Sequence, residues 1–134
     1  MAPPAASAVR PLKVEFCAPL GEALRKEAQQ SRPALVAPER VDGDQLLVTA
    51  DYPGGCGAHD FKICASEFLE QGSQPQIPLR VIHRSDDRCD GAVREKMTID
   101  LGPIKRNYER MYRRNAGTVL LELPNGELMY RFGD

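Results

Sequence analysis

The chain has 134 residues, with 18 Lys and Arg against 19 Asp and Glu, giving a formal net charge of −1. This balance provides no overall field that favours nucleic acid or an anionic membrane surface, and the chain lacks the run of about 18 apolar residues that a bilayer-spanning helix needs. The length predicts one domain with a core that folds without a metal or a disulfide.

The start of the chain is rich in Pro and Ala, and we expect residues 1–11 to be a flexible lead to a single domain over residues 12–134. Leu12, Val14 and Phe16 alternate with polar residues. A period of two is typical of a half-buried strand.

The next stretch predicts a helix and a connector. Apolar residues at helical spacing, after Pro19, predict a short surface helix over residues 20–30. The Pro-containing residues 31–38 are expected to connect it to a turn at residues 41–44, because each proline disfavours helix just before it.

The middle of the chain predicts two strands, over residues 45–52 and 58–64, separated by Pro53-Gly54-Gly55. The short, Gly-rich break favours a hairpin with a bulge. In the second strand His59 shares a face with Phe61, so the alternation rule turns this histidine toward the core.

The following segment predicts a strand that ends near His83, on its more apolar face, then a polar turn over residues 85–91. Alternating apolar residues from Val93 to Leu101 predict the next strand.

The C-terminal part predicts a helix and a hairpin. Apolar residues at helical spacing favour an amphipathic helix over residues 103–114. Strands over residues 118–123 and 127–132 are joined by Asn125-Gly126, a dipeptide that suits a type I′ turn. Strands with short connections therefore predict a mainly β fold: an antiparallel, immunoglobulin-like β-sandwich or an open barrel, with one or two short helices.

The four cysteines allow two disulfides. Cys56 and Cys89 are both expected at strand edges, and if those strands are neighbours a bridge would stabilise the fold by about 3–4 kcal/mol. Cys17 and Cys64 both fall at positions on the polar face of their expected strands. A second bridge, between these two cysteines, is compatible with that placement. Such bridges are favoured in an oxidising compartment.

Zinc binding is an alternative use of the same region. Cys56 and His59, followed by His83 and Cys89, offer two thiolates and two imidazoles, and zinc accepts a tetrahedral Cys2His2 set. The second pair is spaced more widely than usual, and a histidine on an apolar face is more often a core residue with a satisfied ring nitrogen.

A cysteine hydrolase is a third and more distant hypothesis. Cys56 lies between two glycines, with His59 close in sequence as a base and Asp60 or Asp87 as an orienting group. The sequence shows no strand-to-helix elbow of the kind that presents a nucleophile, so we predict no catalytic residue.

The helix over residues 103–114 carries a basic face, composed of Lys105, Arg106, Arg110, Arg113 and Arg114. Its tyrosines fall on the apolar stripe, where they cannot stack on bases. A solvated helix face, or contact with an acidic protein partner, is therefore favoured over nucleic-acid binding.

Several motifs form a recognisable set: Tyr52-x-Gly54-Gly55-Cys56-x-x-His59-x-Phe61, Leu79-x-Val81-x-His83, Asp87-x-Cys89-x-x-Ala92 and Ile99-Asp100-Leu101-x-Pro103-Ile104. The set, over roughly residues 46–132, resembles small, uncharacterised bacterial exported proteins, often predicted lipoproteins. The resemblance implies a periplasmic or secreted β-domain in which Cys56 pairs with Cys89 and the two histidines lie nearby. It implies no activity.

Together these observations predict a noncatalytic, extracytoplasmic domain that binds or scaffolds another protein, stabilised by a Cys56–Cys89 disulfide and without a cofactor. A zinc-binding domain is the alternative.

Overall fold

The computed structural model describes residues 9–17, 31–71 and 74–133. Among them are β1 (Arg10–Phe16), β2 (Leu35–Asp42), β3 (Gln45–Gly54), β4 (Asp60–Ala65), β5 (Leu69–Gln71), β6 (Gln74–Arg84), β7 (Gly91–Asp100), α2 (Gly102–Tyr112), β8 (Gly117–Leu123) and β9 (Gly126–Phe132). The helix expected over residues 20–30 lies outside the described residues. β1 begins at Arg10, inside the stretch 1–11 that was expected to be a lead.

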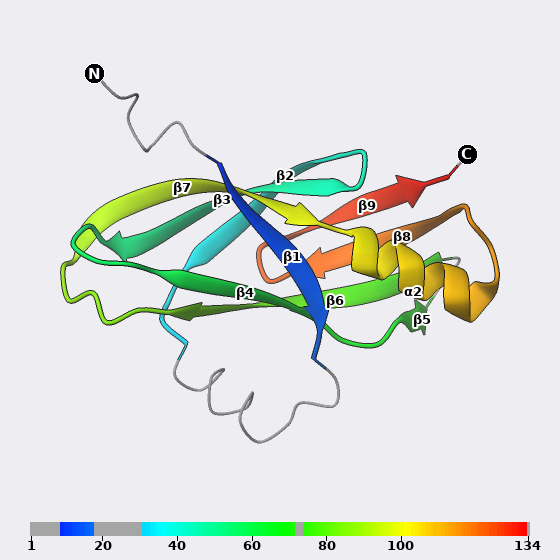
Figure 1. Ribbon diagram of the computed structural model, residues 1–134, viewed down its shortest axis with the longest axis horizontal. Helices are drawn as coiled ribbons and strands as arrows, with labels where there is room; N and C mark the ends of the chain where they lie inside the picture. Colours follow the sequence, from blue (N-terminus) through cyan, green and yellow to red (C-terminus); the bar gives the residue numbers. More distant parts are fainter. Residues whose placement is uncertain (1–8, 18–30, 72–73, 134) are drawn as a thin grey trace.

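The strands form one sheet in the order β2-β3-β7-β1-β4-β6-β8-β9, with β5 paired to β6. The sheet curves until its two ends approach each other (Figure 1). There the side-chain amide of Asn125 donates to the carbonyl oxygen of Val36 at 3.4 Å, and a Cβ on Gly126 would lie 3.0 Å from Pro38 Cγ. The mainly β prediction is confirmed in its open-barrel form.

Pairing in this barrel is mixed. β1 runs parallel to both of its neighbours, β4 and β7, and β6 runs parallel to β8. The other pairings are antiparallel. The hairpin expected at Pro53-Gly54-Gly55 is wrong, because β7 pairs along the whole of β3, from Gln45 opposite Asp100 to Gly54 opposite Gly91. β4 pairs instead with β1 and β6.

The connector expected over residues 31–38 is wrong from residue 35 onward, since β2 occupies residues 35–42. The turn expected at residues 41–44 is confirmed, because Gly43 and Asp44 form the turn between β2 and β3. β2 is an edge strand that pairs with β3, and the register shifts between Pro38 and Arg40. An edge strand tolerates a proline at such an irregularity, because the missing N–H need not serve a neighbour.

The hairpin of β8 and β9 is confirmed, but its turn differs from the prediction. Leu123 pairs with Gly126, so Pro124 and Asn125 form the two-residue loop. The ring of Pro124 fixes a negative φ, which a type I′ turn does not allow at its first central position.

The barrel encloses a continuous core. Its fully buried members include Leu46, Val48, Ile63, Ile77, Met97, Ile99, Leu101, Val119, Leu121 and Tyr130. Burying each large aliphatic side chain contributes about 1.5–3 kcal/mol. α2 covers one end of the barrel with Ile104 and Tyr108 facing inward, and no helix within the described residues has the length and apolar composition needed to cross a membrane.

Candidate functional site

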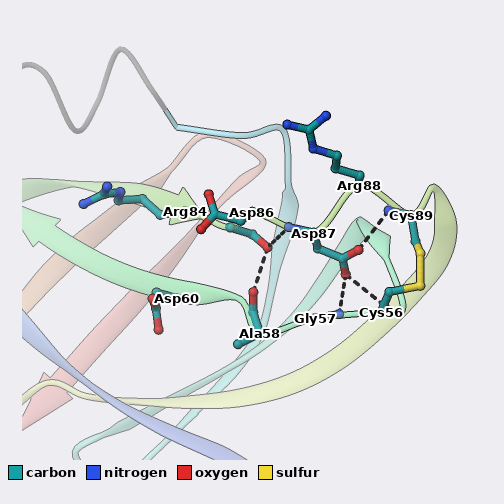
Figure 2. Close-up of a pocket in the computed structure, with 10 residues that line it drawn as sticks. Cys56, Gly57, Ala58, Asp60, Arg84, Asp86, Asp87, Arg88 and Cys89 are labelled. Atoms are coloured by element: carbon teal, nitrogen blue, oxygen red, sulfur yellow. Dashed lines mark hydrogen bonds between the residues drawn. A yellow bond between two sulfur atoms is a disulfide. The ribbon is translucent and has the colours of Figure 1, made fainter.

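The connections β3–β4 and β6–β7 lie together at the end of the barrel opposite α2 (Figure 1). We call residues 55–59 and 85–90 the tip. β3 and β7 stay paired as far as Gly54 and Gly91. Cys56 follows the first by two residues and Cys89 precedes the second by two, so the register places the cysteines opposite each other. They form a disulfide with a Cα–Cα distance of 5.8 Å (Figure 2).

The carboxylate of Asp87 organises the tip. Its Oδ2 accepts backbone N–H groups of Cys56 at 3.0 Å and Gly57 at 2.9 Å, and its Oδ1 accepts that of Cys89 at 2.9 Å (Figure 2). The side chain is fully buried. These N–H donors, Cys56 and Cys89 first and the His59 ring next, hold the pKa of this carboxyl far below its usual range. Asp87 is therefore ionised and ties both sides of the disulfide together.

A hydroxyl adds a second link across the tip. Ser85 Oγ donates to the carbonyl oxygen of Ala58 at 2.7 Å and accepts the backbone N–H of Asp87 at 2.9 Å. The guanidinium of Arg32 donates to the carbonyl oxygens of Ser85 and Asp87. The tip is therefore hydrogen-bonded to the segment that precedes β2 as well as to itself.

Two histidines continue the chain of hydrogen bonds beneath the tip. His59 Nε2 lies 2.9 Å from Asp87 Oδ2, and His59 Nδ1 lies 2.8 Å from His83 Nε2. His83 Nδ1 lies 3.3 Å from the carbonyl oxygen of Pro33. His59 is 6% exposed and His83 is 1% exposed, and burial lowers the pKa of His83. The inward orientation predicted for both histidines is confirmed.

Aromatic rings enclose the histidine pair. The Tyr52 ring centroid lies 4.6 Å from that of His59 and 4.9 Å from that of His83. Phe61 stacks on His83 at 4.4 Å, with the two rings nearly parallel. The hydroxyl of Tyr52 donates to Glu95 Oε1 at 2.6 Å, and burial together with this carboxylate raises the pKa of Tyr52 to about 12. The phenol stays neutral.

Arg10 joins this region to β1 and β7. Its Nε lies 2.6 Å from Glu95 Oε2, and its Nη1 donates to the carbonyl oxygen of His59. Its guanidinium also lies over the Phe61 ring. Arg10, Arg32 and Glu95 were not identified from the sequence, because the pairing of β1 with β7 and the return of the chain at Arg32 are long-range features.

The four candidate zinc ligands lie close together but are not arranged as a ligand set. The sulfurs of Cys56 and Cys89 are bonded to each other, and the ring nitrogens of His59 and His83 are hydrogen-bonded to each other. Cys56, Asp87 and Cys89 have ligand-type atoms within 4.8 Å of one another, but the Asp87 oxygens already accept N–H donors. Zinc binding through these four residues stays a prediction, and it requires that the Cys56–Cys89 disulfide be reduced to free both thiolates.

The tip also has no free thiol in this structure, because the bridge consumes both sulfurs. A shallow hollow of about 850 Å³ lies over it, lined by residues that include Ala58, Asp60, Asp86 and Arg88. The rings of His59 and His83 are buried beneath the surface of the tip, so a molecule in the hollow would not meet an exposed imidazole base. The arrangement favours a structural role over a catalytic one.

A second disulfide joins Cys17, just after β1, to Cys64 in β4, with a Cα–Cα distance of 5.4 Å. The backbone N–H of Cys17 donates to the carbonyl oxygen of Ala65 at 3.1 Å. This bridge stabilises the parallel pairing of β1 and β4, and it completes the pairing of the four cysteines.

The predicted basic face lies on α2 and just beyond it. Lys105 Nζ is 3.6 Å from Asp44 Oδ2, and Arg110 Nη2 donates to Asn107 Oδ1 at 3.0 Å. Arg106, Arg113 and Arg114 are exposed. Arg113 ends the helix with a left-handed backbone, at φ 54°. Neither Arg113 nor Arg114 has a side-chain partner among the residues that the structure describes.

No protein-family profile and no curated protein sequence matches this chain. A solved NigD-like immunity protein from Bacteroides caccae is similar in structure, with a TM-score of 0.60 and 11% sequence identity, over 91% of this chain and 58% of that one. A Bacteroides vulgatus protein of unknown function, DUF1344, aligns at a TM-score of 0.47 and 14% identity, over 94% of this chain and 57% of its own. This chain spans less than three-fifths of either neighbour. At such identity the first likeness establishes the β fold alone.

Proposed function

We propose that this chain is a noncatalytic, extracytoplasmic binding domain that contacts an acidic protein partner through α2 and the residues that follow it. The observation that carries the proposal is the exposure of Arg113 and Arg114, without partners among the described residues, beside a Met111 that is 56% exposed. The reactive groups of the tip are used internally, whereas this surface is free to make contacts.

The composition of the surface supports a protein partner. We call Arg106, Arg110, Met111, Arg113 and Arg114 the α2 surface. Arginine and methionine are enriched at protein interfaces, where Arg makes charged contacts and Met adapts to the partner. A local excess of positive charge on a chain of net charge −1 favours an acidic partner.

Nucleic acid suits the same surface less well. Base stacking needs exposed aromatic rings. Tyr108 is buried against the barrel, and the hydroxyl of Tyr112 donates to Glu70 Oε1 at 2.7 Å. The arginines could contact phosphates, but the tyrosines do not offer a stacking platform.

Two further observations support the location and the class. Disulfides persist in oxidising compartments, and this small domain has two. A protein described as an immunity protein has the same kind of fold, which is compatible with a domain that acts by binding.

A site-specific photo-crosslinker tests the proposal. The probe is a photoreactive amino acid at Met111, in protein exposed to the extracytoplasmic fraction of the source cells. We expect one protein adduct, reduced about tenfold by Arg113→Glu with Arg114→Glu, which corresponds to about 1.4 kcal/mol of lost affinity. High salt should weaken it too.

The matched controls use the opposite end of the barrel. A photoreactive residue at Arg88, in the tip, should give no such adduct, and Arg88→Glu should leave the Met111 adduct unchanged. An adduct of equal yield from both positions, or one unaffected by the α2 charge reversals, would overturn the assignment of this surface.

A further inference from the structure

The hydrogen bonds that run from Asp87 to Pro33 have an acceptor at each end. Asp87 contributes a carboxylate oxygen, and Pro33 contributes a carbonyl oxygen. Between them lie the rings of His59 and His83, with three contacts of 2.9, 2.8 and 3.3 Å in sequence. Each contact needs one proton, because neither end can donate.

A count of ring protons gives a definite result. A neutral imidazole has one N–H, so two neutral histidines supply two protons for these three hydrogen bonds. The complete set therefore needs one proton more than two neutral rings provide.

We propose that His59 and His83 form a buried site for a single shared proton, and that this proton holds the disulfide-linked tip in the conformation described here. The site lies beneath the tip and is separate from the α2 surface, so the inference does not depend on the proposed partner.

The geometry also places the proton. His83 Nδ1 donates to the Pro33 carbonyl, which leaves His83 Nε2 as an acceptor for His59 Nδ1–H. His59 then donates from both nitrogens and is an imidazolium facing the Asp87 carboxylate. Burial lowers the pKa of His83, which favours a neutral ring there. A second proton would set two N–H groups against each other across 2.8 Å.

Among the other charged groups around the pair, Arg10 and Glu95 neutralise each other, whereas Arg32 keeps its positive charge. Arg10, from β1, is paired with Glu95 of β7, and Tyr52 of β3 is a neutral phenol that donates to the same Glu95. Arg32, before β2, donates to backbone carbonyls at the tip. Asp87 is therefore the counter-charge for the proton, at 2.9 Å from His59.

Loss of the proton would act directly on the tip. One of the three buried hydrogen bonds would be left unmade, and an unsatisfied buried group is costly. Asp87 would lose its cationic partner while still accepting the N–H groups of Cys56, Gly57 and Cys89. The chemical environment of these amides should therefore change with the protonation of the pair.

Nitrogen NMR of the histidine rings tests the proposal, and the chain's two histidines make the spectrum simple. At about pH 8 an exposed imidazole, with a pKa of about 6.5, is almost entirely neutral. We expect one ring, His59, to show two protonated nitrogens there, and the other, His83, to be neutral and protonated at Nδ1. At higher pH, the amide signals of Cys56, Gly57 and Cys89 should shift with the same midpoint as the His59 ring, while that of Leu121 in β8 should not.

Asp87→Asn provides the matched variant. An amide removes the counter-charge, so the doubly protonated ring should be absent at about pH 8. If this variant does not fold, the titration of the unmodified protein still tests whether the two histidines share one proton. Two neutral rings at that pH would overturn the proposal, and so would a ring titration that the tip amides do not follow.

Discussion

Gly54 lies so close to His59 that a Cβ on Gly54 would be 2.6 Å from His59 Nε2 and 3.0 Å from Asp87 Oδ2. The absence of a side chain at Gly54 therefore lets the two groups meet at 2.9 Å. We expect Gly54→Ala to displace the ring or the carboxylate and to lower the free energy of unfolding by about 1–3 kcal/mol, the usual range for overpacking. Urea unfolding, followed by circular dichroism, measures it.

Gly57 is the matched control. A Cβ there would lie 3.5 Å from its nearest neighbour, Asp87 Cβ, which is an ordinary contact. Gly57→Ala should change the free energy of unfolding by less than about 1 kcal/mol. Equal losses for the two variants would mean that the close approach of Gly54 to His59 is not what constrains this position.

The two disulfides should contribute similar amounts of stability. Cys56–Cys89 spans a sequence separation of 33 and Cys17–Cys64 one of 47. The chain-entropy model assigns about 3–4 kcal/mol to each, slightly more to the longer loop. Replacing either pair with serines should lower the free energy of unfolding by about 3–4 kcal/mol. Urea unfolding without reductant measures this loss.

Intact mass on the unmodified protein provides the control for these variants. The denatured, unreduced chain should be lighter than the reduced chain by four hydrogens, two for each bridge. A chain with all thiols free and a native mass raised by one zinc would contradict the bridges and support the zinc alternative.

The stability of the protein should depend on pH through His83 and Asp87. The pKa of His83 lies below its ordinary value of 6.5, so at this residue the unfolded chain binds more protons than the folded chain once the pH falls below that value, and the contribution of His83 to stability decreases. The pKa of the Asp87 carboxyl lies below its ordinary 3.8. Its contribution is therefore present above that value and is lost as the pH falls further.

Unfolding free energies measured in urea from about pH 7 to about pH 3 test the contributions of His83 and of Asp87. His83→Gln should flatten the decrease near the histidine range, because it removes the buried group that must stay neutral. Asp87→Asn should flatten the decrease at lower pH. A wild-type decrease between about pH 6 and pH 5 that His83→Gln leaves unchanged would contradict the role assigned to His83.

The sequence predicted much of what is local. The alternation of apolar and polar residues predicted most strands and the inward orientation of His59 and His83, because a two-residue period is visible in the sequence itself. β2 was missed because the prolines of residues 31–38 are typical of a connector. The tolerance of a strand for Pro38 depends on an edge position that only the assembled sheet defines.

The pairing of strands could not be predicted in the same way. Gly54 and Gly55 suggested a hairpin, yet β3 pairs with β7, which lies about forty residues further along. Strand partners depend on long-range contacts that no single segment carries. The hydrogen bonds of the site could not be predicted for the same reason. The sequence did not indicate that Asp87 binds the backbone of both Cys56 and Cys89, because this position follows from the register of β3 with β7.

Tyr130 is fully buried, and its hydroxyl donates to Asp44 Oδ1 at 2.7 Å. Burial and this carboxylate raise its pKa far above the ordinary range, so the phenol is a permanent donor. Tyr130→Phe should lower the free energy of unfolding by about 1 kcal/mol, the net value of such a hydrogen bond when the acceptor is partly exposed. Tyr112→Phe is the control, because its hydroxyl bonds Glu70 at the surface and its loss should cost less. Equal effects would show that burial of the donor does not set the difference.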